Sequence, residues 1–302
     1  MAEESMRLHD WMGSLPSACL QRSICELAIP CCHNAGSREV KCVPKFLLKN
    51  YVGGTLAGLP GVSEIAAPFA SVASVCQSHR IGELLEMGVR AIDLRVGMHE
   101  DYIHICHGVV CESLLVDVLQ EVATFSDHHK TEFVVLLIKS DWEHRHEFDT
   151  ADNWMMLQSV LLSVFGDSLV EQSTEMKLPL QQLLSKGRRV LALLQMPEEV
   201  DLLAGVRATS ATLQSSWKPS TSSVADMVQV LHEWRDSGRM LPQPGVFKLL
   251  EVALPKTPRS LAPRALQEFR EFLRNTPLQI GANLDFPDEE TLRAIVRKNW
   301  ES

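Results

Sequence analysis

Residues 88–96 read Gly-Val-Arg-Ala-Ile-Asp-Leu-Arg-Val, and this stretch decides the fold that we expect. Charged and aliphatic residues alternate along it, with Asp93 and Arg95 on one face and Ile92, Leu94 and Val96 on the other. A period of two residues is typical of a β-strand. Ionisable side chains on one face fit the mouth of a parallel barrel, where polar groups gather at the carboxyl ends of the strands. An amphipathic edge strand with an Asp–Arg pair in water fits the same pattern.

Strand-like and helix-like segments alternate through the rest of the chain. Further strands are indicated at 24–29, 102–108, 133–138, 188–194, 212–216, 246–252 and 278–284, and amphipathic helices at 78–87, 112–125, 153–165, 224–234 and 262–273. Such alternation implies parallel crossover units. The eight strands favour an α/β fold of the TIM-type (β/α)8 kind, with irregular or incomplete closure allowed. A doubly wound sheet is the alternative, but no phosphate-loop glycine pattern supports it.

Composition narrows the class of protein. The 302 residues are 45% hydrophobic and 22% charged, without a linker or repeat, so we expect residues 1–302 to form a single barrel domain. The net charge of −9 argues against nucleic acid as a partner. The amino-terminal residues show no secretory signal, and the eight cysteines show no zinc or disulfide spacing. We therefore expect a cytoplasmic protein with reduced thiols and no obligate protein partner.

Four ordered motifs resemble those of the phosphatidylinositol-specific phospholipase C X-domain family. Residues 28–37, Ala-Ile-Pro-Cys-Cys-His-Asn-Ala-Gly-Ser, resemble its first signature, and residues 88–95 and His107-Gly108 its second and third. Asp285-Phe286 matches a fourth, near the carboxyl end. The form His33-Asn34-Ala-Gly-Ser is particularly similar to the glycosylphosphatidylinositol-cleaving phospholipases of trypanosomes. The resemblance extends from Trp11 to Trp300 and implies cleavage of an inositol phosphodiester.

This resemblance implies general acid–base catalysis by two histidines. His33 would be the base that activates the inositol 2-hydroxyl, and His107 the acid that protonates the leaving oxygen of diacylglycerol. Histidine suits both roles because its pKa lies near neutral pH. Asp285 would hold the far nitrogen of the base, and Asn34 would lie beside the leaving oxygen. The products would be diacylglycerol and inositol 1,2-cyclic phosphate, from phosphatidylinositol or a glycosylphosphatidylinositol.

Arg95 indicates the metal-independent branch of that family. Calcium-dependent members place a carboxylate at this position as one of several oxygen ligands. A guanidinium instead offers a planar fork of donors to phosphate oxygens. Lys139, at the end of the strand predicted at 133–138, adds a second cation, and Asp93 completes the expected catalytic set. We therefore expect neither a metal nor another cofactor.

Some positions depart from the family pattern and leave alternatives open. Cys31-Cys32 replaces a usual Gly-Ser pair, and Gln195 stands where bacterial members use an arginine for substrate binding. Trp217 offers a stacking face for the inositol ring in place of a tyrosine. Two other interpretations remain. One is a metal-dependent glycerophosphodiester phosphodiesterase on a similar barrel, and the other is an inactive barrel that binds phosphoinositides.

Residues 52–77 form an apolar segment with a single charged side chain, Glu64. Repeated Gly and Pro argue against a transmembrane helix. In a barrel this segment would follow the first strand and so lie on the active-site face. We predict that Leu56, Leu59 and Phe69 contact the membrane surface that carries the inositol lipid, which makes the protein peripherally membrane-associated. A loop packed against the barrel wall is the alternative.

Overall fold

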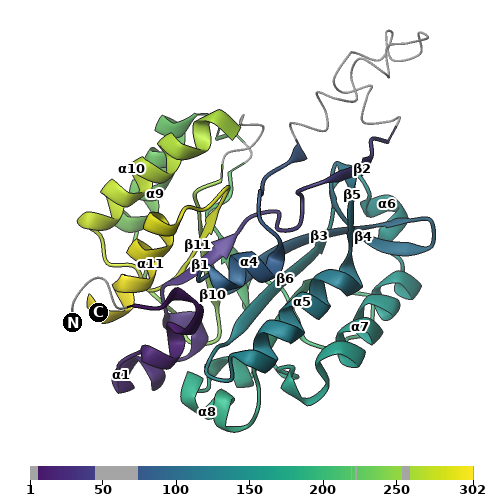
Figure 1. Ribbon diagram of the computed structural model, residues 1–302, viewed down its shortest axis with the longest axis horizontal. Coiled ribbons are helices and arrows are strands. Elements are labelled where there is room, and N and C mark those ends of the chain that lie inside the picture. Colours follow the sequence, from purple (N-terminus) through teal and green to yellow (C-terminus); the bar gives the residue numbers. More distant parts are fainter. Residues whose placement is uncertain (1–5, 45–73, 219, 222, 254–258, 302) are drawn as a thin grey trace.

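The computed structural model describes residues 6–44, 74–218, 220–221, 223–253 and 259–301. Within these ranges, eight parallel strands form the centre of the fold (Figure 1): β1 (Ile29–Cys32), β3 (Ala91–His99), β6 (Val134–Ser140), β7 (Val190–Gln195), β8 (Val206–Arg207), β9 (Leu213–Ser215), β10 (Phe247–Glu251) and β11 (Gly281–Leu284). Each strand pairs in parallel with its neighbour, and β1 pairs with both β3 and β11. Among the described residues no pairing joins β8 to β9, so the barrel is open there. The predicted TIM-type barrel with incomplete closure is confirmed.

Antiparallel strands extend this sheet at β3. They are β4 (Tyr102–His107), β5 (Val109–Leu114) and β2 (Val40–Cys42). Glu100 and Asp101 have φ angles of 49° and 65°, and this left-handed backbone turns the chain back at once from β3 into β4. Counting residues 102–108 as a barrel strand was therefore wrong, because alternation does not distinguish a hairpin strand from a parallel one. The two-residue strand β8 takes the eighth place in the barrel.

Helices cover the outer face of the barrel. In Figure 1, α4 (Ile81–Glu86), α5 (Leu115–His128), α7 (Ala151–Phe165) and α8 (Leu180–Ser185) lie on one side, and α9 (Val224–Asp236), α10 (Ala262–Arg274) and α11 (Glu289–Glu301) on the other. Ile92, Leu94 and Val96 of β3 pack into the core under the helices, whereas Ala91 belongs to the core inside the barrel. The two faces predicted from the alternation are thus confirmed. Shorter helices are α1 (Ser17–Leu20) and α6 (Arg145–Phe148).

The predicted strand at 24–29 begins later than expected. Residues Ile24–Glu26 form a 3-10 turn closed by a capping box between Ser23 and Glu26, and β1 starts only at Ile29. The side chain of Glu26 accepts a hydrogen bond from the backbone N–H of Ser23 at 3.0 Å. This local pairing competes with extended structure, which explains why the apolar residues there do not form a strand.

A buried ion pair anchors β3 at the amino end of the barrel. Arg90 and Glu132 have fully buried side chains, and Nε of Arg90 donates to Glu132 at 2.8 Å. Arg90 also donates to backbone carbonyls, including those of Leu8 and His9, and Glu132 accepts from the backbone N–H of Met12. The pair therefore holds the amino-terminal segment against the base of the barrel. Loss of either partner would lower the stability of the fold, because the remaining charge would then be buried without its partner.

None of the helices described is both long and apolar enough to cross a bilayer. The predicted membrane-contact residues Leu56, Leu59 and Phe69 lie outside the described residues.

Candidate active site

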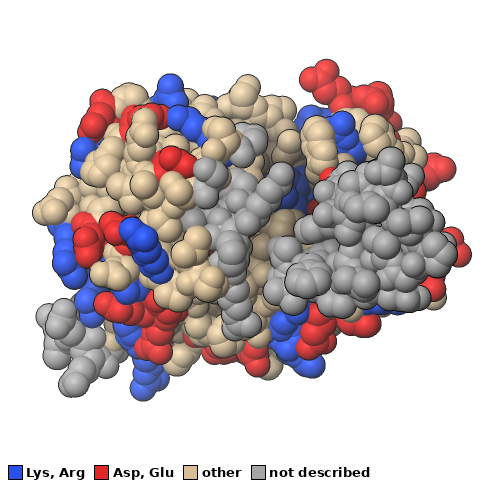
Figure 2. All heavy atoms as spheres, turned by 90° about the horizontal axis from the view of Figure 1, so that it is seen from above, with Lys and Arg blue, Asp and Glu red and all other residues tan. Residues whose placement is uncertain are grey.

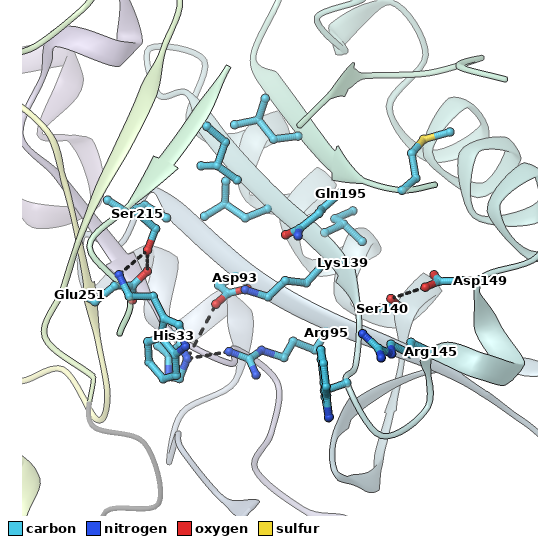
Figure 3. A pocket seen from close by; sticks show the side chains of 18 of the residues that line it. His33, Asp93, Arg95, Lys139, Ser140, Arg145, Asp149, Gln195, Ser215 and Glu251 are labelled. Atoms are coloured by element: carbon cyan, nitrogen blue, oxygen red, sulfur yellow. Dashed lines mark hydrogen bonds and ion pairs between the residues drawn. The ribbon is translucent and has the colours of Figure 1, made fainter. Parts of the chain in front are cut away.

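The polar residues singled out in the sequence gather at the carboxyl ends of the barrel strands. They line a pocket of about 570 Å³, shown in Figure 3. Six of them line it: His33, Asp93, Arg95, Lys139, Gln195 and Trp217. His33 directly follows β1, Asp93 and Arg95 lie on β3, and Lys139 and Gln195 lie at the ends of β6 and β7. Parallel strands bring these ends together, as expected for the mouth of a barrel.

His33 lies between a carboxylate and a guanidinium. Its Nδ1 is 2.9 Å from Oδ1 of Asp285, and its Nε2 is 3.0 Å from Nη2 of Arg95. Because a guanidinium only donates, Nε2 accepts the hydrogen bond from Arg95. Nδ1 therefore carries the ring proton and donates a hydrogen bond to Asp285. His33 is 4% exposed, and its neighbour Trp217 lies with its ring centroid 5.4 Å away. This geometry belongs to one tautomer of the neutral imidazole, in which the lone pair of Nε2 accepts from Arg95.

Asp285 also changes the basicity of His33. Burial lowers the pKa of His33, but the charge of Asp285 and its hydrogen bond outweigh burial and raise that pKa to about 9. At neutral pH the imidazolium would therefore be favoured, and Arg95 would then have to leave Nε2. The contact between Arg95 and Nε2 belongs to the deprotonated form, which is the form able to take a proton from a hydroxyl.

Asp93 lies among three positive or potentially positive groups. Its carboxylate is 3.4 Å from Nζ of Lys139 and 4.0 Å from Nε2 of His33. Burial opposes the charged form of Asp93, but Lys139, Arg95 and His33 together lower its pKa to about 2. Asp93 is therefore an anion under all ordinary conditions. It balances the cations of the site and holds the ammonium of Lys139 toward the pocket (Figure 3).

His107 ends β4 and lies at a tight turn. Its Nδ1 is 2.9 Å from the carbonyl of Ser74, so that nitrogen is the donor, and 3.5 Å from Sγ of Cys76. Burial and the charge of Arg95 lower the pKa of His107. His107 does not line the pocket that His33 faces. The structure therefore places the two histidines in one region without directing both into the same cavity.

The turn after His107 is held by the loop that follows β6. Gly108 has a φ angle of 70°, and its N–H donates to Asp141 at 3.1 Å. The carbonyl of Gly108 lies 3.1 Å from Nε2 of His144. Asp141 and His144 are both buried. No sequence pattern singled out Asp141, and only the folded chain brings it and His144 to the turn.

Two further residues behind His33 were not anticipated. Gln77 is fully buried and donates to the carbonyls of His33, at 2.6 Å, and Leu284, at 3.2 Å. It therefore joins the ends of β1 and β11, which carry His33 and Asp285. Cys76 contacts the amide of Asn34, whose Nδ2 lies 3.5 Å from Sγ. Asn34, Asp285 and His107 lie outside the pocket lining but adjoin this group.

The remaining predicted substrate-binding residues lie on the pocket wall. Gln195 is exposed at the end of β7, and Trp217 is half-buried beside His33. On the same side of the pocket as Trp217, Glu251 accepts from Ser215 at 2.5 Å and from Asn283 at 2.8 Å. The pocket thus offers amide, hydroxyl, carboxylate and aromatic groups together, which suits a polyhydroxylated ring.

The adjacent cysteines beside His33 are not reactive thiols. Cys31 and Cys32 are fully buried in β1, and burial raises the pKa of both thiols well above the ordinary value. They fill space on the two faces of the strand, since Cys31 packs inside the barrel and Cys32 beneath the helices.

The surface around the barrel mouth carries both signs of charge. Figure 2 shows the molecule from above, with Lys and Arg interspersed with Asp and Glu around the rim of the view. The described part of this face is therefore not a basic patch, in keeping with the net charge of −9. Positive charge at the site comes from individual residues, chiefly Arg95 and Lys139 in the pocket.

Comparison with known proteins agrees with this arrangement. Residues 67–191 match the family described as phosphatidylinositol-specific phospholipase C, X domain. The similarity to this family, expected from the motifs, is confirmed. The human PI-PLC X domain-containing protein 1 is 27% identical over 192 residues, a match that covers 60% of this chain and 55% of the human protein. The chain thus matches little more than half the length of that relative.

Solved structures of bacterial enzymes share the fold. Phosphatidylinositol-specific phospholipase C from Listeria monocytogenes superimposes with a TM-score of 0.71 at 17% identity, covering 97% of this chain and 98% of that one. The Staphylococcus aureus enzyme gives a TM-score of 0.68 at 14% identity, with coverage of 97% and 98%. These likenesses establish a common barrel architecture over nearly the whole chain.

Proposed function

We propose that this protein is a phosphodiesterase that cleaves phosphatidylinositol or a glycosylphosphatidylinositol to diacylglycerol and inositol 1,2-cyclic phosphate. The observation that carries the proposal is the alignment of Asp285, His33 and Arg95. The partly buried carboxylate of Asp285 fixes the proton on Nδ1 of His33, and Nε2 then lies beside the guanidinium of Arg95 at the pocket. This is the arrangement required of a general base that works next to a phosphoryl group.

The reaction uses the inositol 2-hydroxyl as its nucleophile. Nε2 of His33 takes the hydroxyl proton as the new P–O bond forms, and the bond from phosphorus to the diacylglycerol oxygen breaks. His107 gives a proton to that leaving oxygen, so one proton enters and one leaves the pair of histidines. Asn34 adjoins the region between the two histidines and would contact the leaving oxygen. Positioned acid–base catalysis of this kind contributes about 10²–10⁴-fold.

Arg95 and Lys139 supply the positive charge that the developing phosphorane requires. Arg95 would exchange its contact with His33 for the non-bridging phosphate oxygens when substrate binds. Lys139, held by Asp93, would contact the same oxygens from β6. Preorganised donors aimed at developing charge commonly contribute more to catalysis than any other single effect. We infer that the reaction proceeds without a metal ion.

The pocket wall would receive the inositol ring. Trp217 lines the pocket with its ring tilted by 32° from that of His33, and its apolar surface would contact the bound inositol ring. Gln195, Ser215 and Glu251 offer hydrogen bonds to ring hydroxyls.

We further propose that a peripherally bound, cytoplasmic protein reaches this substrate at a membrane surface. Leu56, Leu59 and Phe69 of the apolar segment 52–77 are the proposed contacts. Each apolar side chain that enters the acyl boundary would contribute roughly 1.5–3 kcal/mol to binding. Three such side chains would hold the barrel mouth at the headgroup layer without a spanning helix.

Two observations bear on the alternatives. Asp93 is paired with Lys139, and Glu251 accepts hydrogen bonds from Ser215 and Asn283. Because these pocket carboxylates are already engaged, they are disfavoured as the paired acidic ligands of a metal-dependent glycerophosphodiesterase. Gln195 in place of an arginine favours an inactive phosphoinositide-binding barrel.

Turnover of radiolabelled phosphatidylinositol in detergent micelles, with and without chelator, tests the proposal. Chelator-resistant turnover that His33→Ala abolishes supports it, whereas lipid binding without turnover supports the inactive barrel.

A further inference from the structure

A second kind of chemistry is grouped beside His33. Within the part of the chain that the structure describes, His33, Cys76 and Asp285 bring an imidazole nitrogen, a thiol sulfur and a carboxylate oxygen within 4.8 Å of one another. Cys76 and His33 are buried, and Asp285 is partly buried. The proposed acid–base mechanism uses no thiol, so Cys76 is an additional group at the catalytic centre.

We propose that His33, Cys76 and Asp285 form an inhibitory binding site for zinc. Thiolate, imidazole and carboxylate are the ligand types of zinc sites, and three protein ligands plus water complete a tetrahedral shell. Calcium and magnesium prefer oxygen ligands only, so a site with sulfur and nitrogen discriminates against both. The ligand set therefore specifies a thiophilic ion and differs from the carboxylate site of calcium-dependent relatives.

Charge decides which nitrogen of His33 takes part. Nε2 contacts the guanidinium of Arg95 at 3.0 Å, which repels a cation on that side. Nδ1 contacts the carboxylate of Asp285 at 2.9 Å, on the anionic side of the ring. Zinc at Nδ1 displaces the proton that Nδ1 donates to Asp285, and the neutral imidazole then carries its proton on Nε2, so Arg95 has to leave that nitrogen. The thiol of Cys76 also loses its proton, because the thiolate is the ligand.

One neighbour of the sulfur, Asn34, supports the site. The amide of Asn34, which is 1% exposed, lies against Sγ of Cys76, and its Oδ1 has no hydrogen-bond partner among the described residues. That oxygen can accept from a water bound to the ion, as outer partners of metal sites do. Nδ1 of His107 is 3.5 Å from the same sulfur, but it donates to the carbonyl of Ser74 and is therefore not among the proposed ligands.

Zinc in this position would stop catalysis. It would bind Nδ1 in place of its proton and so hold the proton of His33 on Nε2, the nitrogen that has to accept the proton of the inositol 2-hydroxyl. Inhibition rests on the proposed function, but zinc binding itself does not. The binding experiment below therefore uses no substrate, so its outcome is independent of whether the protein is an enzyme.

The test is calorimetric titration of zinc chloride into the full chain after removal of metals. We expect one zinc per chain, no competition by calcium or magnesium, and affinity lowered about 100-fold or more by Cys76→Ser and by Cys76→Ala. Cys42→Ser is the matched control, because Sγ of Cys42 lies 3.9 Å from His99, a second Cys–His pair outside the site. Unchanged affinity in the Cys76 variants, or loss of binding in Cys42→Ser, would overturn the proposal.

Cobalt provides a readout that does not depend on the variants folding. Cobalt bound by the unaltered chain should show a thiolate-to-metal charge-transfer band together with tetrahedral d–d bands. A spectrum with no thiolate band would rule out Cys76 as a ligand. Zinc should also raise the unfolding temperature of the unaltered chain, since binding to the native state stabilises it, and should leave folded Cys76→Ser unchanged.

Discussion

Asp285 contacts Nδ1 of His33 at 2.9 Å although 252 residues separate the two in the chain. β11, which ends just before Asp285, pairs in parallel with β1, and Cys32 is in register with Leu284. The closing pair of barrel strands thus aligns the carboxylate with the imidazole. The buried amide of Gln77 bridges the ends of both strands and secures this relationship.

Turnover should survive EDTA and EGTA, because Arg95 supplies the charge that a calcium ion supplies elsewhere. Removing that guanidinium with Arg95→Asp should lower metal-free kcat by about 10²–10³-fold, the range for losing one donor to a developing oxyanion. Release of inositol phosphate from phosphatidylinositol is the measurement. Activity of the unaltered protein that disappears with EGTA and returns with calcium would contradict metal-free catalysis.

His33→Ala and His107→Ala should each lower kcat by about 10³-fold, within the range for losing a positioned acid or base. The substrate should be inositol lipid in detergent micelles, which separates chemistry from vesicle binding. Normal kcat in either variant would remove that histidine from the mechanism.

The pH profile of kcat/KM should be bell-shaped, with a basic limb near 9. His33 must be deprotonated and His107 protonated; burial and Arg95 lower the pKa of His107, which sets the acidic limb below 6.5. Between the two limbs lies a plateau, on which only a small fraction of the protein has His33 deprotonated and His107 protonated at the same time. Asp285→Asn removes the charge that raises the pKa of His33, so the basic limb should move to lower pH. A basic limb that stays in place would show that Asp285 does not tune His33.

Asp141→Ala should lower kcat about 10- to 100-fold with little change in KM, because Asp141 positions the turn that carries His107. Asp141 also opposes the lowered pKa of His107 through its charge, so the acidic limb should move to lower pH. Asp141→Asn keeps an acceptor for the Gly108 N–H and should retain more activity than Asp141→Ala. Equal kcat in both variants, with the acidic limb unmoved, would contradict this role.

Glu132→Ala should lower the free energy of unfolding by about 3–5 kcal/mol, because it leaves the charge of Arg90 buried without its partner. Urea denaturation followed by circular dichroism is the measurement. The exposed pair of Lys130 and Asp127 is the control, and Lys130→Ala should change stability by less than about 1 kcal/mol. If Glu132→Ala is no more destabilising than Lys130→Ala, the pair does not anchor the barrel.

Local patterns pointed to several residues that the structure brings together in the candidate site. The alternation around Asp93 and Arg95 correctly placed both side chains on one face, because strand geometry depends only on adjacent residues. Motif similarity pointed to His33 and Asp285, and the structure brings these two together. Continuous apolar runs likewise predicted β6 and β7 to within two residues.

The errors occurred where a pattern has two structural solutions. The alternation at 102–108 fits a parallel or an antiparallel strand, and the left-handed Glu100 and Asp101 make it a hairpin. The apolar residues at 24–29 fit a strand, but the capping box of Ser23 and Glu26 forms a 3-10 turn. Neither competing interaction shows in hydrophobic periodicity alone.

The sequence by itself determined the barrel class and the identity of its ionisable residues, because periodicity and motif spacing are local properties of the chain. Only the tertiary structure decided which groups surround His33. Cys76, Gln77 and Asp141 reach the site from loops, and loop side chains carry no periodic signal that predicts their position. Their hydrogen bonds depend on the parallel pairing of distant strands, which closes the barrel and brings loops remote in sequence to one end.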